Sequence, residues 1–155
     1  MSSPETKMDF FEVGDKTALI CTDSTAGEAI RESLRELDYK FHTAETPDLA
    51  IERLRYTPYD VIIIQENFSG TSLKSNPLLS YLTPLPMAQR RNSMICLVGT
   101  SFKTLDAMQA FAQSVHLVVN PMDLVNFTAI LKKGRAEFDN TYKVYKDVFA
   151  AMAEK

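Results

Sequence analysis

Short apolar runs alternate along this chain with segments in which apolar residues recur at helical spacing. Apolar runs of this length are typical of strands that are buried on both faces of a sheet. The predicted strands span residues 17–21, 40–43, 60–65, 94–98 and 117–119. Because strands and helices alternate, and crossovers between parallel strands are right-handed, the sequence predicts an α/β fold. We expect a doubly wound five-stranded parallel sheet with helices on both faces.

The helical segments between these strands have recognisable starts and inward faces. Thr46 followed by Pro47 is typical of an N-cap with proline in the first turn, and it predicts a helix through Leu54. Helices are also predicted over 26–37, 75–82 and 103–114. The helix over 103–114 is expected to turn these side chains toward the core: Leu105, Met108, Phe111 and Ala112. From 123 to 153 the pattern predicts a single helix on the order of 45 Å long.

The composition limits the classes of partner. Hydrophobic residues make up 45% and charged residues 24% of the 155 residues, which suits one ordinary globular domain. A net charge of −3, from 17 basic and 20 acidic residues, does not indicate a nucleic-acid or membrane-surface partner. No apolar stretch approaches the roughly 20 residues of a membrane-spanning helix, and the first residues do not resemble a secretion signal. We therefore expect a cytoplasmic protein.

The residue types that most often bind metals or cofactors are few and separated. Cys21 and Cys96 each lie inside an apolar run, where a thiol is usually a small buried hydrophobic group. His42 and His116 lie in separate strand-like runs, without the spacing of a metal site. No glycine-rich phosphate-binding motif follows any predicted strand. The sequence therefore predicts neither a metal site nor a cofactor.

The third predicted strand raises the main functional question. Open α/β sheets place their chemistry where strands end, and here the apolar run 61–64 ends in Gln65. A side-chain amide neither ionises nor attacks a substrate, so this strand end lacks a nucleophile.

Two stretches resemble the receiver domain of two-component response regulators: LDYKFHTAETPDLAIERLRYTPYDVIII over 37–64, and the later LVVNP. The resemblance covers about 16–134. It implies the (βα)5 flavodoxin-like receiver fold and a role in two-component signal transduction. Around that domain we expect an N-terminal extension over 1–15 and a C-terminal helical extension over 135–155.

Members of that family phosphorylate one of their own aspartates with groups at strand ends. An acidic pair after the first strand binds Mg²⁺, and an aspartate that ends the third strand is the nucleophile. A threonine or serine at the end of the fourth strand and a lysine after the fifth hold the phosphoryl oxygens. The corresponding positions in this chain are Thr22 with Asp23, Gln65, Val98 (or Gly99 in a register shifted by one) and Asn120. The loop after the aspartate corresponds to 65–70, which includes Asn67.

The resemblance therefore implies a receiver fold without receiver chemistry. Gln65 offers no anionic oxygen, Asp23 alone is a poor ligand set for Mg²⁺, and Asn120 carries no charge to neutralise a phosphoryl group. We expect a pseudo-receiver that is not an enzyme and is not phosphorylated at Gln65. Such a protein would act through a protein partner in a signalling assembly.

Two other functions stay open at this point. A small-molecule-binding or enzymatic flavodoxin-like protein would use the polar groups of the strand-end crevice: Asp23, Gln65, Asn67 and Asn120. An atypical phospho-accepting regulator would use Glu66 or Asp23 as its acceptor. Strand alternation, however, predicts Glu66 on the side opposite Gln65, and Asp23 is expected to cap the first helix.

The resemblance also implies a cis peptide bond between Asn120 and Pro121, because the matching lysine–proline bond of the family is usually cis. Only about 5–6% of X–Pro bonds in folded proteins are cis. This expectation therefore depends on the resemblance alone.

The segment after 134 carries a stripe of large apolar residues. Its members are spaced 4-3-4-3, like the seam of a coiled coil: Phe138, Tyr142, Tyr145, Phe149 and Met152. We expect this helix to form a homodimer or to dock on a partner. The alternative is that it folds back on its own domain, together with Phe10 and Phe11. The segment 71–93 is either an interaction loop or a long connection.

Overall fold

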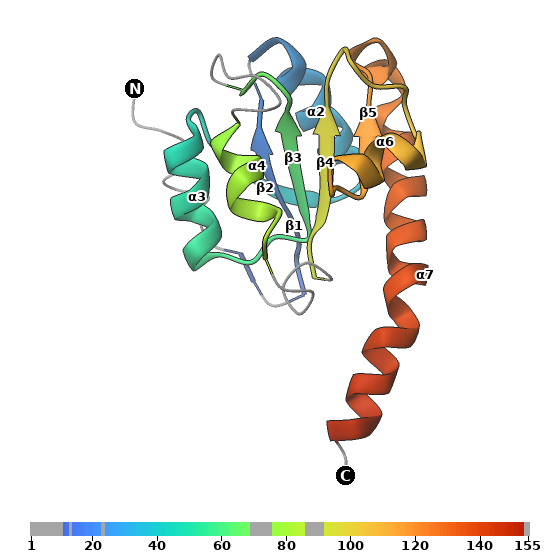
Figure 1. Cartoon of the computed structure of the whole chain (residues 1–155). Helices are drawn as coiled ribbons and strands as arrows, with labels where there is room; N and C mark the ends of the chain where they lie inside the picture. The colour runs from blue at the N-terminus through green and yellow to red at the C-terminus, as the bar shows by residue number, and fades with distance from the viewer. Residues whose placement is uncertain (1–10, 13, 23, 69–75, 86–91, 154–155) are drawn as a thin grey trace.

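The computed structural model describes residues 11–12, 14–22, 24–68, 76–85 and 92–153. Five parallel strands form one sheet in the order β2-β1-β3-β4-β5. The strands are β1 (Lys16–Cys21), β2 (Tyr39–Thr43), β3 (Val61–Gln65), β4 (Met94–Val98) and β5 (Leu117–Val119). The helices are α2 (Ser24–Glu36), α3 (Pro47–Tyr56), α4 (Pro77–Leu82), α6 (Ala107–Ala112), the 3-10 helix η3 (Pro121–Asn126) and α7 (Phe127–Ala153). The predicted doubly wound α/β fold is confirmed (Figure 1).

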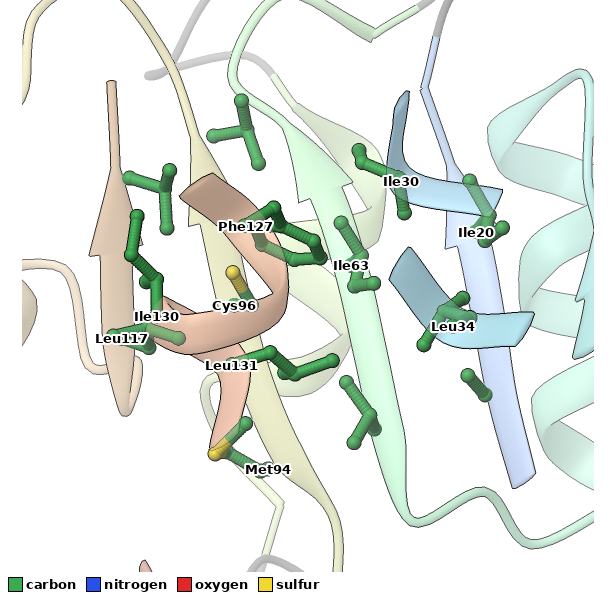
Figure 2. Close-up of a cluster of buried hydrophobic side chains, with 14 of the residues drawn as sticks. Ile20, Ile30, Leu34, Ile63, Met94, Cys96, Leu117, Phe127, Ile130 and Leu131 are labelled. Atoms are coloured by element: carbon green, nitrogen blue, oxygen red, sulfur yellow. The ribbon is translucent and has the colours of Figure 1, made fainter. Parts of the chain in front are cut away.

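Each strand divides its side chains between two hydrophobic cores, because successive residues point to opposite faces. On one face, Met94 and Cys96 of β4 pack with α2 and α7 (Figure 2). On the other face, Ile95 and Leu97 pack with α3, α4 and α6. Cys96 is fully buried, and this burial raises the pKa of its thiol far above the ordinary range. The thiol therefore remains protonated and acts as a packing group, as the sequence predicted.

The helix after β4 differs from its prediction in both length and phase. It begins only after Asp106, whose carboxylate accepts hydrogen bonds from the backbone N–H groups of two residues in its first turn. Met108 and Phe111, which were expected to face inward, are 76% and 81% exposed. Phe102 fills the core instead, from the loop before the helix. The expected inward face was therefore wrong: Ala110 is the buried residue of this helix, and Leu105 and Ala112 are exposed as well.

The last helix covers the sheet and then extends beyond it. α7 starts near the carboxyl ends of the strands and runs past their amino ends (Figure 1). The buried residues of its first half are Phe127, Ile130, Leu131, Gly134 and Phe138. The expected boundary between 134 and 135 thus falls inside a continuous helix, and Phe138 belongs to the core of the domain. Among the described residues, no helix combines the length and the apolar composition needed to span a bilayer.

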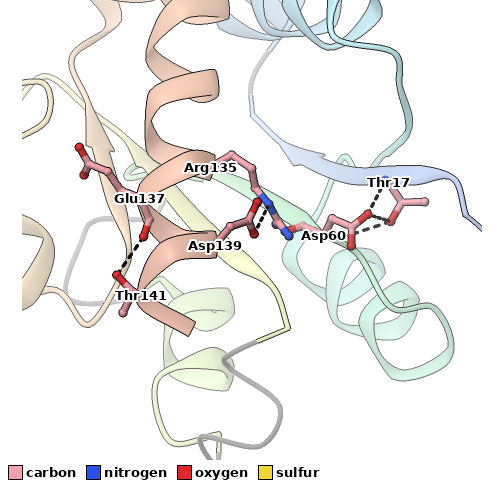
Figure 3. A network of polar contacts seen from close by, with 6 residues as sticks. All are labelled: Thr17, Asp60, Arg135, Glu137, Asp139 and Thr141. Atoms are coloured by element: carbon pink, nitrogen blue, oxygen red, sulfur yellow. Dashed lines mark hydrogen bonds and ion pairs between the residues drawn. The ribbon is translucent and has the colours of Figure 1, made fainter. Parts of the chain in front are cut away.

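A polar network fixes α7 where it leaves the sheet (Figure 3). Arg135 Nη1 donates a hydrogen bond to the carbonyl oxygen of Asp60 at 2.6 Å, and its Nε lies 3.2 Å from a carboxylate oxygen of Asp139. The carboxylate of Asp60 in turn accepts a hydrogen bond from the backbone N–H of Thr17 at 2.9 Å. Because Asp60 and Thr17 precede or begin the central strands, this network ties the helix to the middle of the sheet.

We predict that replacing Phe138 with alanine destabilises the domain by about 3–5 kcal/mol, because the ring is only 4% exposed and its loss leaves a cavity. The matched change Phe111→Ala should alter the free energy of unfolding by less than about 0.5 kcal/mol, since that ring is 81% exposed. Urea denaturation followed by circular dichroism measures both values. Similar losses in the two variants would contradict this assignment of the core.

Candidate functional site

The carboxyl ends of the strands meet at one edge of the sheet, where the predicted site residues gather. Gln65 at the end of β3 pairs with Val98 at the end of β4, and Val98 pairs with Val119 at the end of β5. Thr22 follows β1, the other neighbour of β3. The structure therefore brings together the strand ends that hold Thr22, Gln65, Val98 and Asn120. Asp23, which was expected to cap the first helix, lies outside the described residues.

The end of β3 is held by amide side chains. Gln65 Nε2 donates a hydrogen bond to Asn67 Oδ1 at 2.8 Å, so two of the predicted polar residues bind each other. Asn76, which is 1% exposed, donates to the backbone carbonyl of Gln65 at 3.3 Å. Its Oδ1 accepts hydrogen bonds from the backbone N–H groups of Leu78 and Leu79, which caps α4. Asn76 was not among the predicted site residues, although an asparagine directly before a proline is a typical helix start.

The carboxylate of Glu66 occupies the loop after β4. Its oxygens accept hydrogen bonds from the Ser101 backbone N–H at 3.1 Å and from the Ser101 hydroxyl at 3.0 and 3.2 Å. The Thr100 hydroxyl lies 3.4 Å from the same carboxylate. An internal anion therefore binds the hydroxyls and the backbone amide that follow this strand. Glu66 was considered from the sequence only as an acceptor of a phosphoryl group, and this role was not predicted.

Gly99 makes room for that carboxylate. A Cβ atom built on Gly99 would overlap the Glu66 side chain well inside van der Waals contact. The signal in the sequence was a glycine followed by two hydroxyl residues, Thr100 and Ser101, directly after an apolar strand. These three residues alone do not predict the hydrogen bonds to Glu66, because the sequence does not show which carboxylate lies opposite them.

Asn120 links β5 to the same loop by its side chain. Its Nδ2 donates a hydrogen bond to the carbonyl oxygen of Phe102 at 2.9 Å, and its Oδ1 accepts one from the Met122 backbone N–H at 3.0 Å. Its own backbone N–H donates to the Thr104 hydroxyl at 2.9 Å, and that hydroxyl binds the carboxylate of Asp123. Asn120 therefore caps η3 and fixes the loop, which are structural roles.

The peptide bond between Asn120 and Pro121 is trans, so the expected cis bond was wrong. Asn120 has extended backbone angles of φ −83° and ψ 138°, and Pro121 is the first residue of η3. Proline is well suited to the first position of a helical turn, where its missing N–H group costs no hydrogen bond. The Asn120 side chain completes this start without a cis bend.

The remaining two positions offer little chemistry. Val98 is fully buried in the hydrophobic core and has no hydroxyl group. The Thr22 hydroxyl is buried and has no hydrogen-bond partner among the described residues. Within that same part of the chain, no group of three or more histidine, cysteine, aspartate or glutamate residues could hold a metal ion. At the described positions of the implied Mg²⁺ site, the chain offers the hydroxyl of Thr22 and the amide of Gln65 in place of carboxylates, which does not fit a Mg²⁺ ion.

Several cavities open on the described surface, and one of about 610 Å³ is lined by Thr46 and residues of α3 such as Asp48 and Glu52. Three of them, of about 480, 580 and 670 Å³, are lined by residues at or before the amino ends of the strands, such as Lys16, Asp60 and Ser93. Gln65, Asn67 and Asn120, the described polar residues that were considered for a small molecule, line none of these three cavities.

No protein-family model matches the sequence, and no curated protein matches it significantly. Solved structures do match. A response regulator receiver domain (CheY-like) from Methylobacillus flagellatus is 22% identical, with a TM-score of 0.56 over 78% of this chain and 99% of that one. HP1043, an orphan response regulator of H. pylori, is 13% identical, with a TM-score of 0.59 over 79% and 98%. At these identities the matches establish the CheY-like receiver fold.

A third match extends further along the chain. A yeast Spc42 trimeric coiled-coil segment, amino acids 181–211, fused to another structure, is 16% identical with a TM-score of 0.60. It covers 93% of this chain and 92% of that one.

We predict that Gly99→Ala destabilises the domain by about 1 kcal/mol, because the added methyl group displaces the Glu66 carboxylate from its hydrogen bonds. In a Glu66→Ala background the same substitution should have almost no effect, since the displaced group is already absent. Urea denaturation of the four members of this double-mutant cycle tests the coupling. If Gly99→Ala costs the same in both backgrounds, Glu66 does not bind this loop in solution.

Proposed function

We propose that this chain is a non-catalytic receiver-fold domain, a pseudo-receiver, which acts in signal transduction by protein contact without phosphorylation at Gln65. The observation that carries the proposal is the Glu66 carboxylate bound to the hydroxyls of Thr100 and Ser101. In the receiver family, a hydroxyl at the end of the fourth strand holds a phosphoryl oxygen. Here the hydroxyl groups beside that position already bind an anion that belongs to the chain.

The chemistry of the strand ends supports the same proposal. Phosphoryl transfer to an enzyme side chain requires an anionic nucleophile, and it proceeds through charge that the site must neutralise. Gln65 supplies no anion, and its Nε2 is hydrogen-bonded to Asn67. Asn120 supplies no positive charge and is engaged in capping η3. Gln65 and Asn120 thus each have a structural partner at positions where the family has a reacting or charged group.

The described surface offers apolar contacts for a protein partner. Around α6 and η3, four apolar side chains are between 76% and 87% exposed: Met108, Phe111, Met122 and Val125. Where such side chains gather in one patch, they are typical of a protein–protein contact site. We therefore propose that the domain acts by binding a protein partner through α6 and η3. The hydrogen bonds at the strand ends would hold these two helices in one conformation.

We predict that incubation with acetyl phosphate and Mg²⁺ leaves the intact mass of the protein unchanged. The single variant Gln65→Asp should also stay unmodified, because the second acidic ligand and the lysine remain absent. A receiver domain that is known to accept phosphate from acetyl phosphate serves as the positive control in the same buffer. A hydroxylamine-labile gain of one phosphoryl group in the unmodified sequence would overturn the proposal and support the atypical acceptor instead.

A further inference from the structure

The loop between β4 and α6 lies at the carboxyl ends of the strands and contacts several elements there (Figure 1). We call residues 99–106 the junction loop. The carboxylate of Glu66, directly after β3, accepts hydrogen bonds from the backbone N–H and the hydroxyl of Ser101 in this loop. The backbone N–H of Glu66 donates to the carbonyl oxygen of Val98 at 2.8 Å. Glu66 is therefore fixed to β4 by its backbone, while its side chain holds the loop that follows β4.

The junction loop also holds the start of α6. Gln109 of α6 donates a hydrogen bond from Nε2 to the carbonyl oxygen of Ser101 at 3.4 Å, and its Oε1 accepts one from the Lys103 backbone N–H at 2.7 Å. Asp106, the last residue of the loop, accepts hydrogen bonds from the backbone N–H groups of Met108 and Gln109, both at 3.0 Å. The first turn of α6 therefore follows the position of the loop.

The start of η3 is bound to the same loop. Asn120, directly before η3, donates from its side chain to the carbonyl oxygen of Phe102 and from its backbone to the hydroxyl of Thr104, both at 2.9 Å. The Thr104 hydroxyl in turn donates to the carboxylate of Asp123 in η3. A shift of the junction loop would therefore move the start of η3 as well as that of α6.

Leu105 gives the junction loop a strained conformation. Its φ of 66° lies in the left-handed region, which residues other than glycine, asparagine and aspartate seldom adopt. Its backbone N–H donates to the carbonyl oxygen of Val118 in β5 at 3.0 Å. Strained residues persist where surrounding contacts over-determine their conformation, and they are frequent in switch regions. Loss of the contacts that hold the loop should therefore let Leu105 relax.

The contact with Glu66 differs in strength from the other side-chain contacts of the loop backbone. Hydrogen bonds to an ionised carboxylate are about twice as strong as those between neutral groups. The bonds from Ser101 and Thr100 to Glu66 are of this stronger kind. Those from the amides of Gln109 and Asn120 to loop carbonyl groups join neutral partners. The Glu66 carboxylate therefore contributes most to holding the first half of the loop.

We propose that the junction loop is an internal latch. The Glu66 carboxylate holds it in the strained conformation, and when this contact is lost the loop relaxes and the starts of α6 and η3 move with it. The role of the latch rests on the proposed function, in which α6 and η3 bind a protein partner. An anion of the chain itself then keeps that surface in one conformation. Because coupling is reciprocal, a partner that prefers this conformation strengthens the hold of Glu66 on the loop.

NMR spectroscopy of the full chain tests the latch. Glu66→Ala should shift amide signals that report on the loop and on the starts of α6 and η3, although these amides do not bind Glu66. The reporters are Leu105, Gln109 and Asn120. The signal of Ile63, in the buried centre of β3, should stay in place. The matched control is Glu52→Ala, which removes an exposed glutamate of α3 and should shift none of the reporters.

Acetate tests whether a carboxylate is what holds the loop. Glu66→Ala removes a CH2–COO⁻ unit, which has the size of acetate, from the space beside Gly99 and Ser101. Sodium acetate should return the reporter signals toward their positions in the unmodified protein, whereas sodium chloride at the same concentration should not. Glu66→Gln should cause smaller shifts in the same direction, because its amide oxygen still accepts a hydrogen bond from Ser101.

Two substitutions at Leu105 test the strain. Leu105→Gly and Leu105→Ala both remove the side chain, but only glycine adopts a φ of 66° without steric cost. When each is combined with Glu66→Ala, the glycine variant should keep the signals of Gln109 and Asn120 near their latched positions. The alanine variant should not, because its backbone still gains by leaving the left-handed region.

Four results would each overturn the latch. They are unchanged signals of Gln109 and Asn120 in Glu66→Ala, a shift of the same size at Ile63, no greater recovery in acetate than in chloride, and equal behaviour of the glycine and alanine variants. Phosphorylation of the unmodified chain by acetyl phosphate would overturn the proposed function instead. That reaction is absent from the NMR samples, so the two failures are distinguishable.

Discussion

The structure depends on burying both faces of a short parallel sheet. Strands such as β3 and β4 carry apolar side chains in both directions, so helices must cover each side. α3, α4 and α6 cover one face, and α2 shares the other with α7. Because β4 and β5 lie at the end of the sheet order, only the last helix can complete that second face. The first half of α7 is therefore needed to complete the hydrophobic core.

The elements that can be predicted from the sequence are those in which local signals and burial agree. Each predicted strand was found to within one residue at either end, and Thr46 caps α3 as expected. The helix after β4 was misplaced because its apolar spacing suggested a longer helix, whereas Asp106 sets a later start. Leu105, just before the cap, adopts a left-handed backbone with φ of 66°. Neither feature is visible in the periodicity, because both depend on how the loop packs on the core.

At the strand ends, the sequence predicted which positions would meet but not what would hold them. The topology brings Gln65, Val98 and Asn120 together because parallel strands end at one edge. The bond from Glu66 to the loop after β4 joins residues 35 positions apart, and the role of Asn120 depends on carbonyl groups 18 positions away. Side-chain partners at such separations follow from the fold. The prediction of a cis bond before Pro121 was wrong for a related reason. It was taken from the geometry of the receiver family, whereas here Asn120 caps η3.

The continuous passage of α7 from the core into solvent has a mechanical consequence. A helix that is packed on the sheet along one half and largely exposed along the other can act as a lever that pivots at Arg135 and Phe138. A force on the tip loads the amino ends of the central strands through the Asp60 carbonyl, while the opposite end of the helix lies next to the Asn120 loop. A force on the exposed half is therefore transmitted toward the strand ends at the far edge of the sheet, because the helix is continuous from Phe127 to Ala153.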